Sequence, residues 1–262
     1  GDSLWPLSRK NYPKQFMNIK EGRSLLQETV VRNMPFCDEF IIVTKESYRN
    51  IVNGQMKAFQ SLKYRVVLEG SPKGTAAAIM LGSQFCNQSE LVFVVTADNL
   101  IEGQEYKDAI IRAKELAKQG SIVALGVKPA KKNSNFGYLL RDEENVLKFI
   151  EKIRLDDDES FGYDDGFLWN SGMFLYRAGD LINAARAICP ELYDTCRMAK
   201  RKVAAIRRTV RFSQKVMKDI PQGSIERLIF EKLKDMKVVE TAFRWKDVGN
   251  VCDLDENSSV SH

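Results

Sequence analysis

The stretch "LVFVVTAD", residues 91–98, is an unbroken apolar run that ends in a threonine, an alanine and a carboxylate. Continuous apolar runs of this length, rich in valine, are typical of strands buried on both faces in parallel sheets. In such sheets ligands bind beyond the carboxyl ends of the strands. The stretch therefore predicts a buried strand of a parallel sheet and puts Asp98 at a ligand-binding edge.

Strands and helices alternate on both sides of this stretch. We predict further strands over residues 39–44, 64–70 and 121–127, and helices over 45–59, 74–86 and 105–120, the last ending on Gly120. This alternation is typical of βαβ units, with a largely parallel sheet covered by helices on both faces. The fold class is therefore α/β, a Rossmann-like nucleotide-binding arrangement.

The pattern changes after Lys128. Residues 138–142 and 146–152, separated by "EEN", predict an antiparallel hairpin; residues 167–178 predict a strand and 179–198 a helical stretch. The sheet is thus expected to be mixed, mostly parallel, with an antiparallel subregion. Residues 197–214 form the one basic cluster, which we interpret as the solvated face of a helix.

The composition limits the classes of function that the chain can have. The chain has 262 residues, 44% of them hydrophobic, and a net charge of +5. That charge suits an anionic small molecule and by itself gives no argument for nucleic acid. The longest apolar runs, such as "LVFVV" (91–95), are far short of a membrane span. Five cysteines without metal-binding spacing favour a reduced, cytoplasmic setting. The single histidine is His262, so histidine-dependent nucleophilic and zinc chemistries are not expected in the interior.

Two aspartates are candidate metal ligands. Asp98 ends an apolar strand, where an isolated carboxylate is costly unless it meets a cation. Asp247 lies in "FRWKDVGN", next to a bulky tryptophan that we expect to anchor a tight turn. Two carboxylates, phosphate oxygens and waters suit octahedral Mg²⁺. The alternative for Asp98 is the N-cap of the segment after Ile101.

Other stretches suggest contacts to a phosphorylated ligand. "GSPKGTAAAI" (70–79) puts small residues before a helix, so backbone N–H groups could receive a phosphate or a base edge; a plain turn is the alternative. Gly137 would let a ligand approach the backbone, and Asn170 is an amide among large apolar residues. Glu151 and Lys152 are adjacent and would point to opposite faces of a strand.

Taken in order, these motifs resemble the sugar-1-phosphate nucleotidyltransferases, most closely the branch that transfers a guanylyl group to mannose 1-phosphate. The matching segments cover nearly the whole chain in colinear order: "LWPLSRKNYPKQF" (4–16), "SLLQET" (24–29), "TAD" (96–98), "FGY" (136–138), "FIEK" (149–152), "FLWNSGMF" (167–174), "SIERLIFEK" (224–232) and "WKDVGN" (245–250). The resemblance implies an enzyme that converts GTP and mannose 1-phosphate to GDP-mannose and pyrophosphate. The sugar phosphate is already anionic, so no general base is needed.

By the same resemblance, Lys14 contacts the triphosphate and Arg9 helps to hold its loop. Gly1 and Ser3 fall at the end of the family's glycine-rich nucleotide loop, where Ser3 replaces an arginine. Asp98 and Asp247 would hold Mg²⁺. The prolines in "LWPLSRKNYPKQF" would pre-set the loop, so that little entropy is lost on binding.

The sugar side is implied in the same way. Lys152 would meet the sugar phosphate, while Glu151, Asn170 and the Gly137 backbone would read mannose. Gly74 and Thr75 would bind the nucleobase. The resemblance also implies one domain over 1–262, with a nucleotide half (1–128) and a sugar-phosphate half (129–262), and allows a homodimer. The family's first strand and its C-terminal β-helical segment are not found in the sequence.

Several departures from the family pattern leave alternatives open. Asp98-Asn99 replaces Asp-His, and Gly74-Thr75-Ala76-Ala77 replaces Asn-Thr-Ala-Pro. The altered base loop favours a relative that uses another sugar 1-phosphate or nucleotide. Ser3 favours a non-catalytic paralogue that binds a nucleotide sugar.

Overall fold

The computed structural model describes residues 13–20, 22–129, 133, 136–150, 166–203 and 205–247; for residues 19, 20 and 247 only the backbone is described. Five of the predicted site residues lie outside these ranges: Gly1, Ser3, Arg9, Glu151 and Lys152.

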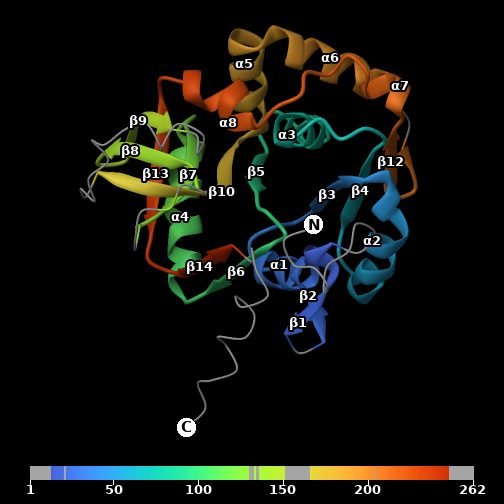
Figure 1. Ribbon diagram of the computed structural model, residues 1–262, viewed down its shortest axis with the longest axis horizontal. Coiled ribbons are helices and arrows are strands. Elements are labelled where there is room, and N and C mark those ends of the chain that lie inside the picture. The colour runs from blue at the N-terminus through green and yellow to red at the C-terminus, as the bar shows by residue number, and fades with distance from the viewer. Residues whose placement is uncertain are drawn as a thin grey trace.

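The first predicted βαβ unit is present. Strands β3 (Phe40–Lys45) and β4 (Tyr64–Glu69) pair in parallel. They are connected through η2 (Glu46–Tyr48), α2 (Arg49–Met56) and η3 (Lys57–Phe59). Strand β12 (Thr209–Phe212) adds to the other side of β4 in parallel, and β11 (Ala205–Ile206) closes the edge as a short hairpin. These strands form the four-stranded sheet β11-β12-β4-β3 (Figure 1).

A second sheet has six strands. Its order is β5 (Leu91–Val94), β10 (Phe167–Arg177), β7 (Ile122–Val127), β13 (Met236–Thr241), β9 (Asn145–Ile150) and β8 (Tyr138–Asp142). Strand β10 lies between β5 and β7 and is antiparallel to both. Strand β13 is parallel to β7, and β8 and β9 form the predicted hairpin. The chain thus has the predicted mixed α/β fold.

The parallel share of the sheet was overestimated. Helix α4 (Glu105–Lys118) connects β5 to β7, but the two strands are not neighbours because β10 separates them. Strand β10 can span both because it is long and irregular: its register with β7 shifts between Asn170 and Phe174, and Gly172 has φ +73°. Among the described pairings, β3–β4, β4–β12 and β7–β13 are parallel.

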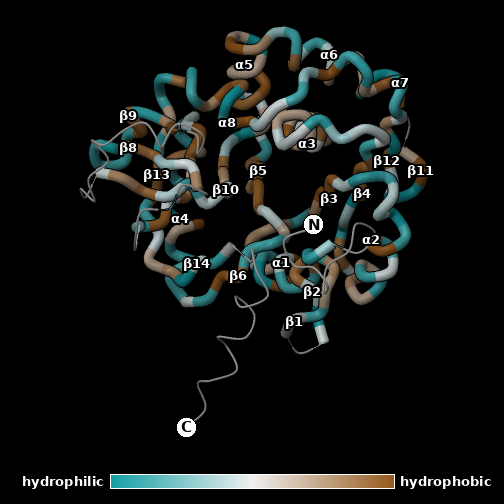
Figure 2. Tube along the Cα trace, in the orientation of Figure 1, coloured by the Kyte–Doolittle hydropathy of each residue, from teal (hydrophilic) through white to brown (hydrophobic). Residues whose placement is uncertain are grey.

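The helices cover the sheets in layers. Helix α3 (Thr75–Ser83) packs with α5 (Ala178–Ile188) and α6 (Pro190–Arg201), while α4 packs against β7, β10 and β13. The largest buried cluster joins α3 and α6 to β12 and includes Met80, Cys196 and Phe212. Val66 and Leu68 face a separate cluster with Val30 of α1 (Leu25–Asn33) and Val52 of α2. Strand β5 is apolar along its length (Figure 2), but it is a half-buried edge strand antiparallel to β10 and not the parallel strand buried on both faces that its sequence predicts.

The local predictions are confirmed with small shifts. Gly120 follows α4 with φ +102°, the left-handed value that a helix-ending glycine adopts. The stretch 179–198 is two helices, because Cys189 has a non-helical conformation and Pro190 begins α6 at its first position. Among the described residues no helix is both long and apolar enough to cross a bilayer.

The helix predicted for the basic cluster at 197–214 is wrong beyond Arg201. Residues 205–206 and 209–212 form β11 and β12 instead. The reason is packing against the rest of the fold. The side chains of Val210 and Phe212, at alternate positions, are buried in the core, and β12 pairs with the otherwise open edge of β4.

Candidate active site

Lys14 lies on a short, well-anchored turn. It begins the 3₁₀ helix η1 (Lys14–Phe16), directly after the buried Pro13. Phe16 is buried and stacks edge-on against Tyr48, with ring centroids 5.4 Å apart. The side chain of Gln55 donates to the Phe16 carbonyl oxygen at 2.8 Å. These contacts tie the turn to α2, so Lys14 is held on a rigid support.

The ammonium of Lys14 meets the carboxylate of Asp98. Lys14 Nζ lies 3.2 Å from Asp98 Oδ2, and the Asp98 side chain keeps 36% of its surface exposed. Asp98 lies in the turn after β5, since that strand ends at Val94 and not at residue 98 as predicted. An exposed carboxylate beside a cation at the carboxyl end of a strand is suited to an ion or a phosphate group.

Asn99 fixes this turn. Its side chain is 4% exposed, and its amide donates to Thr96 Oγ1 at 2.6 Å and to the Ser171 carbonyl oxygen at 3.5 Å. The turn is thereby attached to β10. Asn99 also begins strand β6 (Asn99–Glu102), so Asp98 precedes a strand and is not the helix N-cap that was the alternative.

Asp247 reaches the same place from the other end of the chain. It ends strand β14 (Arg244–Asp247), which pairs antiparallel with β6, and Asp247 lies opposite Asn99 in the register. The backbones of Asp98 and Asp247 are therefore neighbours across 149 positions of sequence. The residues after Asp247, where the tight turn is predicted, lie outside the described ranges, and Trp245 is the expected anchor: its ring centroid lies 4.9 Å from that of Phe136.

These two carboxylates fit a magnesium ion by their chemistry. Mg²⁺ is usually held in proteins by one or two carboxylates and keeps several waters or phosphate oxygens. Asp98 offers a partly exposed carboxylate, and the register brings the backbone of Asp247 opposite Asn99, the residue that follows Asp98. Among the described side chains no group of three or more acidic, histidine or cysteine residues forms a larger metal cage.

Gly137 and Asn170 are brought together as a second part of the site. The Asn170 N–H donates to the Gly137 carbonyl oxygen at 2.8 Å. Asn170 Nδ2 donates to Glu226 Oε1 at 3.2 Å, and its Oδ1 accepts from the Gly172 N–H at 3.1 Å. A primary amide has two donors and two lone pairs, so one of each remains for a ligand.

The loop with Gly74 and Thr75 is locked to a distant segment. Gly74 has φ +95°, and a Cβ there would lie 2.4 Å from the Gly223 carbonyl oxygen. That oxygen accepts from the Ala76 N–H at 3.2 Å, and Thr75 Oγ1 accepts from the Ile225 N–H at 3.0 Å. Part of the donor set predicted for a ligand at this helix start is therefore used within the protein.

The separate parts form one connected site. Ile225 and Glu226 belong to α8 (Ile225–Leu228), so this short helix contacts both Thr75 and Asn170. The Asn99 side-chain amide donates a hydrogen bond to the carbonyl oxygen of Ser171, the neighbour of Asn170. Asp98, the neighbour of Asn99, forms the ion pair with Lys14. A continuous series of polar contacts thus runs from the Gly74 loop to the pair of aspartates.

Glu69 is a residue that the sequence did not single out. It ends β4, immediately before the Gly74 loop, and is 7% exposed. Its Oε1 has no hydrogen-bond partner within the described residues. Burial raises the pKa of Glu69 to about 7, partly offset by the charge of Lys45. A glutamate that follows "VVL" resembles an ordinary strand end in sequence, so only the packing identifies it.

Comparison with known proteins shows the family to which this chain belongs. Residues 1–260 match the family described as nucleotidyl transferases. The chain is 31% identical over 282 residues to a mannose-1-phosphate guanylyltransferase of Salmonella montevideo, covering 100% of this chain and 60% of that protein. It is 30% identical over 276 residues to the enzyme of the same name from Escherichia coli K12, covering 99% and 58%. The chain therefore spans somewhat over half the length of these relatives.

Two solved structures are similar over most of their length. One, from Helicobacter pylori and named mannose-6-phosphate isomerase, has a TM-score of 0.86 and 32% identity, covering 91% of this chain and 96% of that one. The other, from Thermus thermophilus and named mannose-1-phosphate geranyltransferase, has a TM-score of 0.82 and 25% identity, covering 99% and 76%. On the family match over nearly its whole length, this chain belongs to the nucleotidyl transferase family.

Proposed function

We propose that this chain transfers a guanylyl group from GTP to mannose 1-phosphate, releasing pyrophosphate and forming GDP-mannose. A phosphate oxygen of the sugar attacks the α-phosphorus of GTP, and the bond from that phosphorus to the bridging oxygen of pyrophosphate breaks. The observation that carries the proposal is the Lys14–Asp98 pair beside the Asp247 backbone, connected by polar contacts to Asn170 and the Gly74 loop. The named relatives support the choice of GTP and mannose 1-phosphate.

The reaction needs charge neutralisation more than proton transfer. Both reactants are polyanions, and the attacking oxygen needs no base, which suits a chain whose one histidine is His262. Lys14 would neutralise charge that builds on the α-phosphate, and its anchored turn would cost little reorganisation. Asp98 and Asp247 would hold Mg²⁺, and the ion would supply positive charge to offset that of the phosphates. Arg9 would support the loop around Lys14.

The remaining predicted residues would recognise the two substrates. Asn170 and the Gly137 backbone, with Glu151, would contact the sugar hydroxyls, and Lys152 would contact the sugar phosphate. Gly74 and Thr75 would lie against the nucleobase, and Gly1 and Ser3 near the triphosphate.

Asp247→Asn is the direct test of this assignment. It should leave the fold intact and lower the rate of pyrophosphate release by roughly a hundredfold or more, because an amide is a poor ligand for Mg²⁺. Arg244→Gln, on the same strand β14, is the control and should retain activity. Unchanged turnover in Asp247→Asn would exclude this aspartate as a metal ligand.

Substrate choice is tested by a pyrophosphate-release screen of four nucleoside triphosphates against a panel of sugar 1-phosphates. Signal with GTP and mannose 1-phosphate alone supports the proposal. Signal with another pair would select the alternative that the altered loop at Gly74–Ala77 favours. Silence throughout, with nucleotide-sugar binding intact, would select a non-catalytic paralogue.

A further inference from the structure

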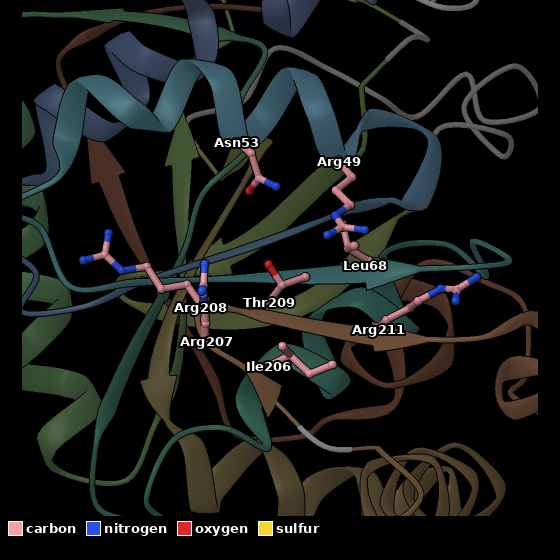
Figure 3. A pocket seen from close by; sticks show the side chains of 8 residues that line it. All are labelled: Arg49, Asn53, Leu68, Ile206, Arg207, Arg208, Thr209 and Arg211. Carbon is pink, nitrogen blue, oxygen red and sulfur yellow. The ribbon is translucent and has the colours of Figure 1, made fainter.

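A groove rich in arginine lies on the four-stranded sheet, between α2 and β12 (Figure 3). It has a volume of about 780 Å³ and is lined by Arg49, Arg207, Arg208, Arg211, Leu68 and Thr209, among others. We call it the arginine groove. Lys14, Asp98 and Asn170 do not line it.

The groove follows from the way β12 joins the sheet. Val210 and Phe212 turn into the core beneath α3 and α6, so Thr209 and Arg211 lie on the opposite face. In the register Arg211 lies beside Leu68 of β4. Arg49 and Asn53 are four residues apart on α2 and therefore share one face of that helix. The helix forms one wall of the groove and the β11–β12 hairpin the other (Figure 3).

Two of the four guanidinium groups have no partner among the residues that the structure describes. Arg211 forms an ion pair with Glu46, and Arg208 lies 4.5 Å from the Tyr64 ring centroid while donating to the Gln60 carbonyl oxygen. Arg49 and Arg207, by contrast, make no hydrogen bond or ion pair with any described residue.

Arg49 and Arg207 come from the two opposite walls of the groove (Figure 3). Arg49 begins α2 directly after the 3₁₀ helix η2, whose first residue, Glu46, is the ion-pair partner of Arg211. Arg207 has φ +55°, a conformation that costs a non-glycine residue about 1 kcal/mol or more. Two cations beside one hollow, neither with a partner among the described residues, are what a site for an anion would require.

We propose that the arginine groove binds the di- or triphosphate group of a small molecule, at a site separate from the catalytic one. Guanidinium groups bind phosphate through paired hydrogen bonds. Several arginines around one hollow can contact several linked phosphate groups, so a di- or triphosphate suits the groove better than a single phosphate does. Ile206, whose side chain is exposed, adds apolar surface for a ring, and Asn53 and Thr209 add hydrogen-bonding groups. The modest net charge of +5 disfavours a nucleic acid as the occupant.

The test is a calorimetric titration of the whole chain with tripolyphosphate, inorganic phosphate, GTP and a single-stranded RNA. The groove variant is Arg49→Gln combined with Arg207→Gln. The control is Lys57→Gln combined with Arg201→Gln, which removes the same charge from exposed positions outside the groove. We expect the groove variant to bind tripolyphosphate roughly tenfold more weakly or worse, and the control to bind as wild type does. The affinity should also fall with added salt.

The titration needs no turnover, so it can succeed or fail independently of the catalytic proposal. If GTP fills two sites in wild type and one in the groove variant, with its KM in the pyrophosphate-release assay unchanged, the separate site is supported. Equal binding in wild type and the groove variant would overturn the proposal. So would equal losses in the control, binding of RNA alone, or a KM for GTP that rises in step with the loss of tripolyphosphate binding.

Discussion

Glu69 carries a carboxyl group into the interior at the end of β4, and this should leave a signature in the pH dependence of stability. Its pKa is raised by burial from 4.5 to about 7. Between pH 4.5 and pH 7 the Glu69 carboxyl group keeps its proton in the folded state but has lost it in the unfolded state. The free energy of unfolding therefore falls as pH rises from about 4.5 to 7, by up to about 3 kcal/mol.

Glu69→Gln removes this titration. We expect the variant to be more stable than wild type at pH 8, by about 1–3 kcal/mol, and to show little difference at pH 4.5. Urea unfolding at both values measures it, with Glu105→Gln, an exposed glutamate of α4, as the control. If the free energy of unfolding of wild type and of Glu69→Gln fell equally between pH 4.5 and pH 8, a group other than Glu69 would cause the pH dependence.

Lys14 should matter for catalysis and little for stability. The Lys14–Asp98 pair is partly exposed, and such pairs contribute about 0–1 kcal/mol to folding. Lys14→Gln should therefore lower kcat/KM for pyrophosphate release by roughly a hundredfold while leaving the unfolding midpoint nearly unchanged. Lys57→Gln should change neither quantity. A loss of stability as large as the loss of activity would make Lys14 a structural residue.

At the scale of elements, the loop before α3 depends on the glycine that begins it. Gly74→Ala adds a Cβ that would lie 2.4 Å from the Gly223 carbonyl oxygen, at φ +95°. We expect a loss of about 1–3 kcal/mol in stability and weaker nucleotide binding, since the 223–226 segment must move. Gly54→Ala is the matched control: a Cβ on this glycine of α2 meets nothing within 4 Å. This variant should be more stable than wild type by about 0.5–1 kcal/mol, as measured by thermal or urea unfolding.

The elements that the sequence predicts well are those whose own pattern decides them. The apolar runs of β3, β4 and β7 and the period of α4 are local signals. Strands β6 and β14, four residues each, were missed because they are stable only through each other, across more than 140 residues of chain. The hairpin β11–β12 was mistaken for helix because its residues become strands only where β4 offers an open edge.

For the candidate site, as for the fold, some residues could be named in advance and others could not. The resemblance to a family named Lys14, Asp98, Asn170 and Gly74, and the structure connects these residues by polar contacts. The structural roles of the supporting residues could not be predicted from the sequence. Asn99 and Glu226 act through partners 72 and 56 positions away, Ser171 and Asn170, so no local pattern marks them.

At the scale of the whole molecule, the candidate site joins segments from the beginning, middle and end of the chain. Lys14, Asp98 and Asp247 come from η1, the turn after β5, and β14. A ligand that contacts all three should therefore stabilise the whole fold. GTP with Mg²⁺ should raise Tm by an amount that grows with the logarithm of GTP concentration, and EDTA should reduce the rise.

The same thermal measurement separates the metal from the nucleotide. Asp98→Asn should bind GTP with a Tm shift that no longer responds to Mg²⁺, because one of the two proposed carboxylate ligands is gone. The Arg49→Gln and Arg207→Gln variant should keep the Mg²⁺-dependent part, since the arginine groove contains no acidic residue among those that line it. A Mg²⁺ response that survives in Asp98→Asn would mean that the ion, if bound, is held by other groups, and that the pairing of β6 with β14 serves the fold alone.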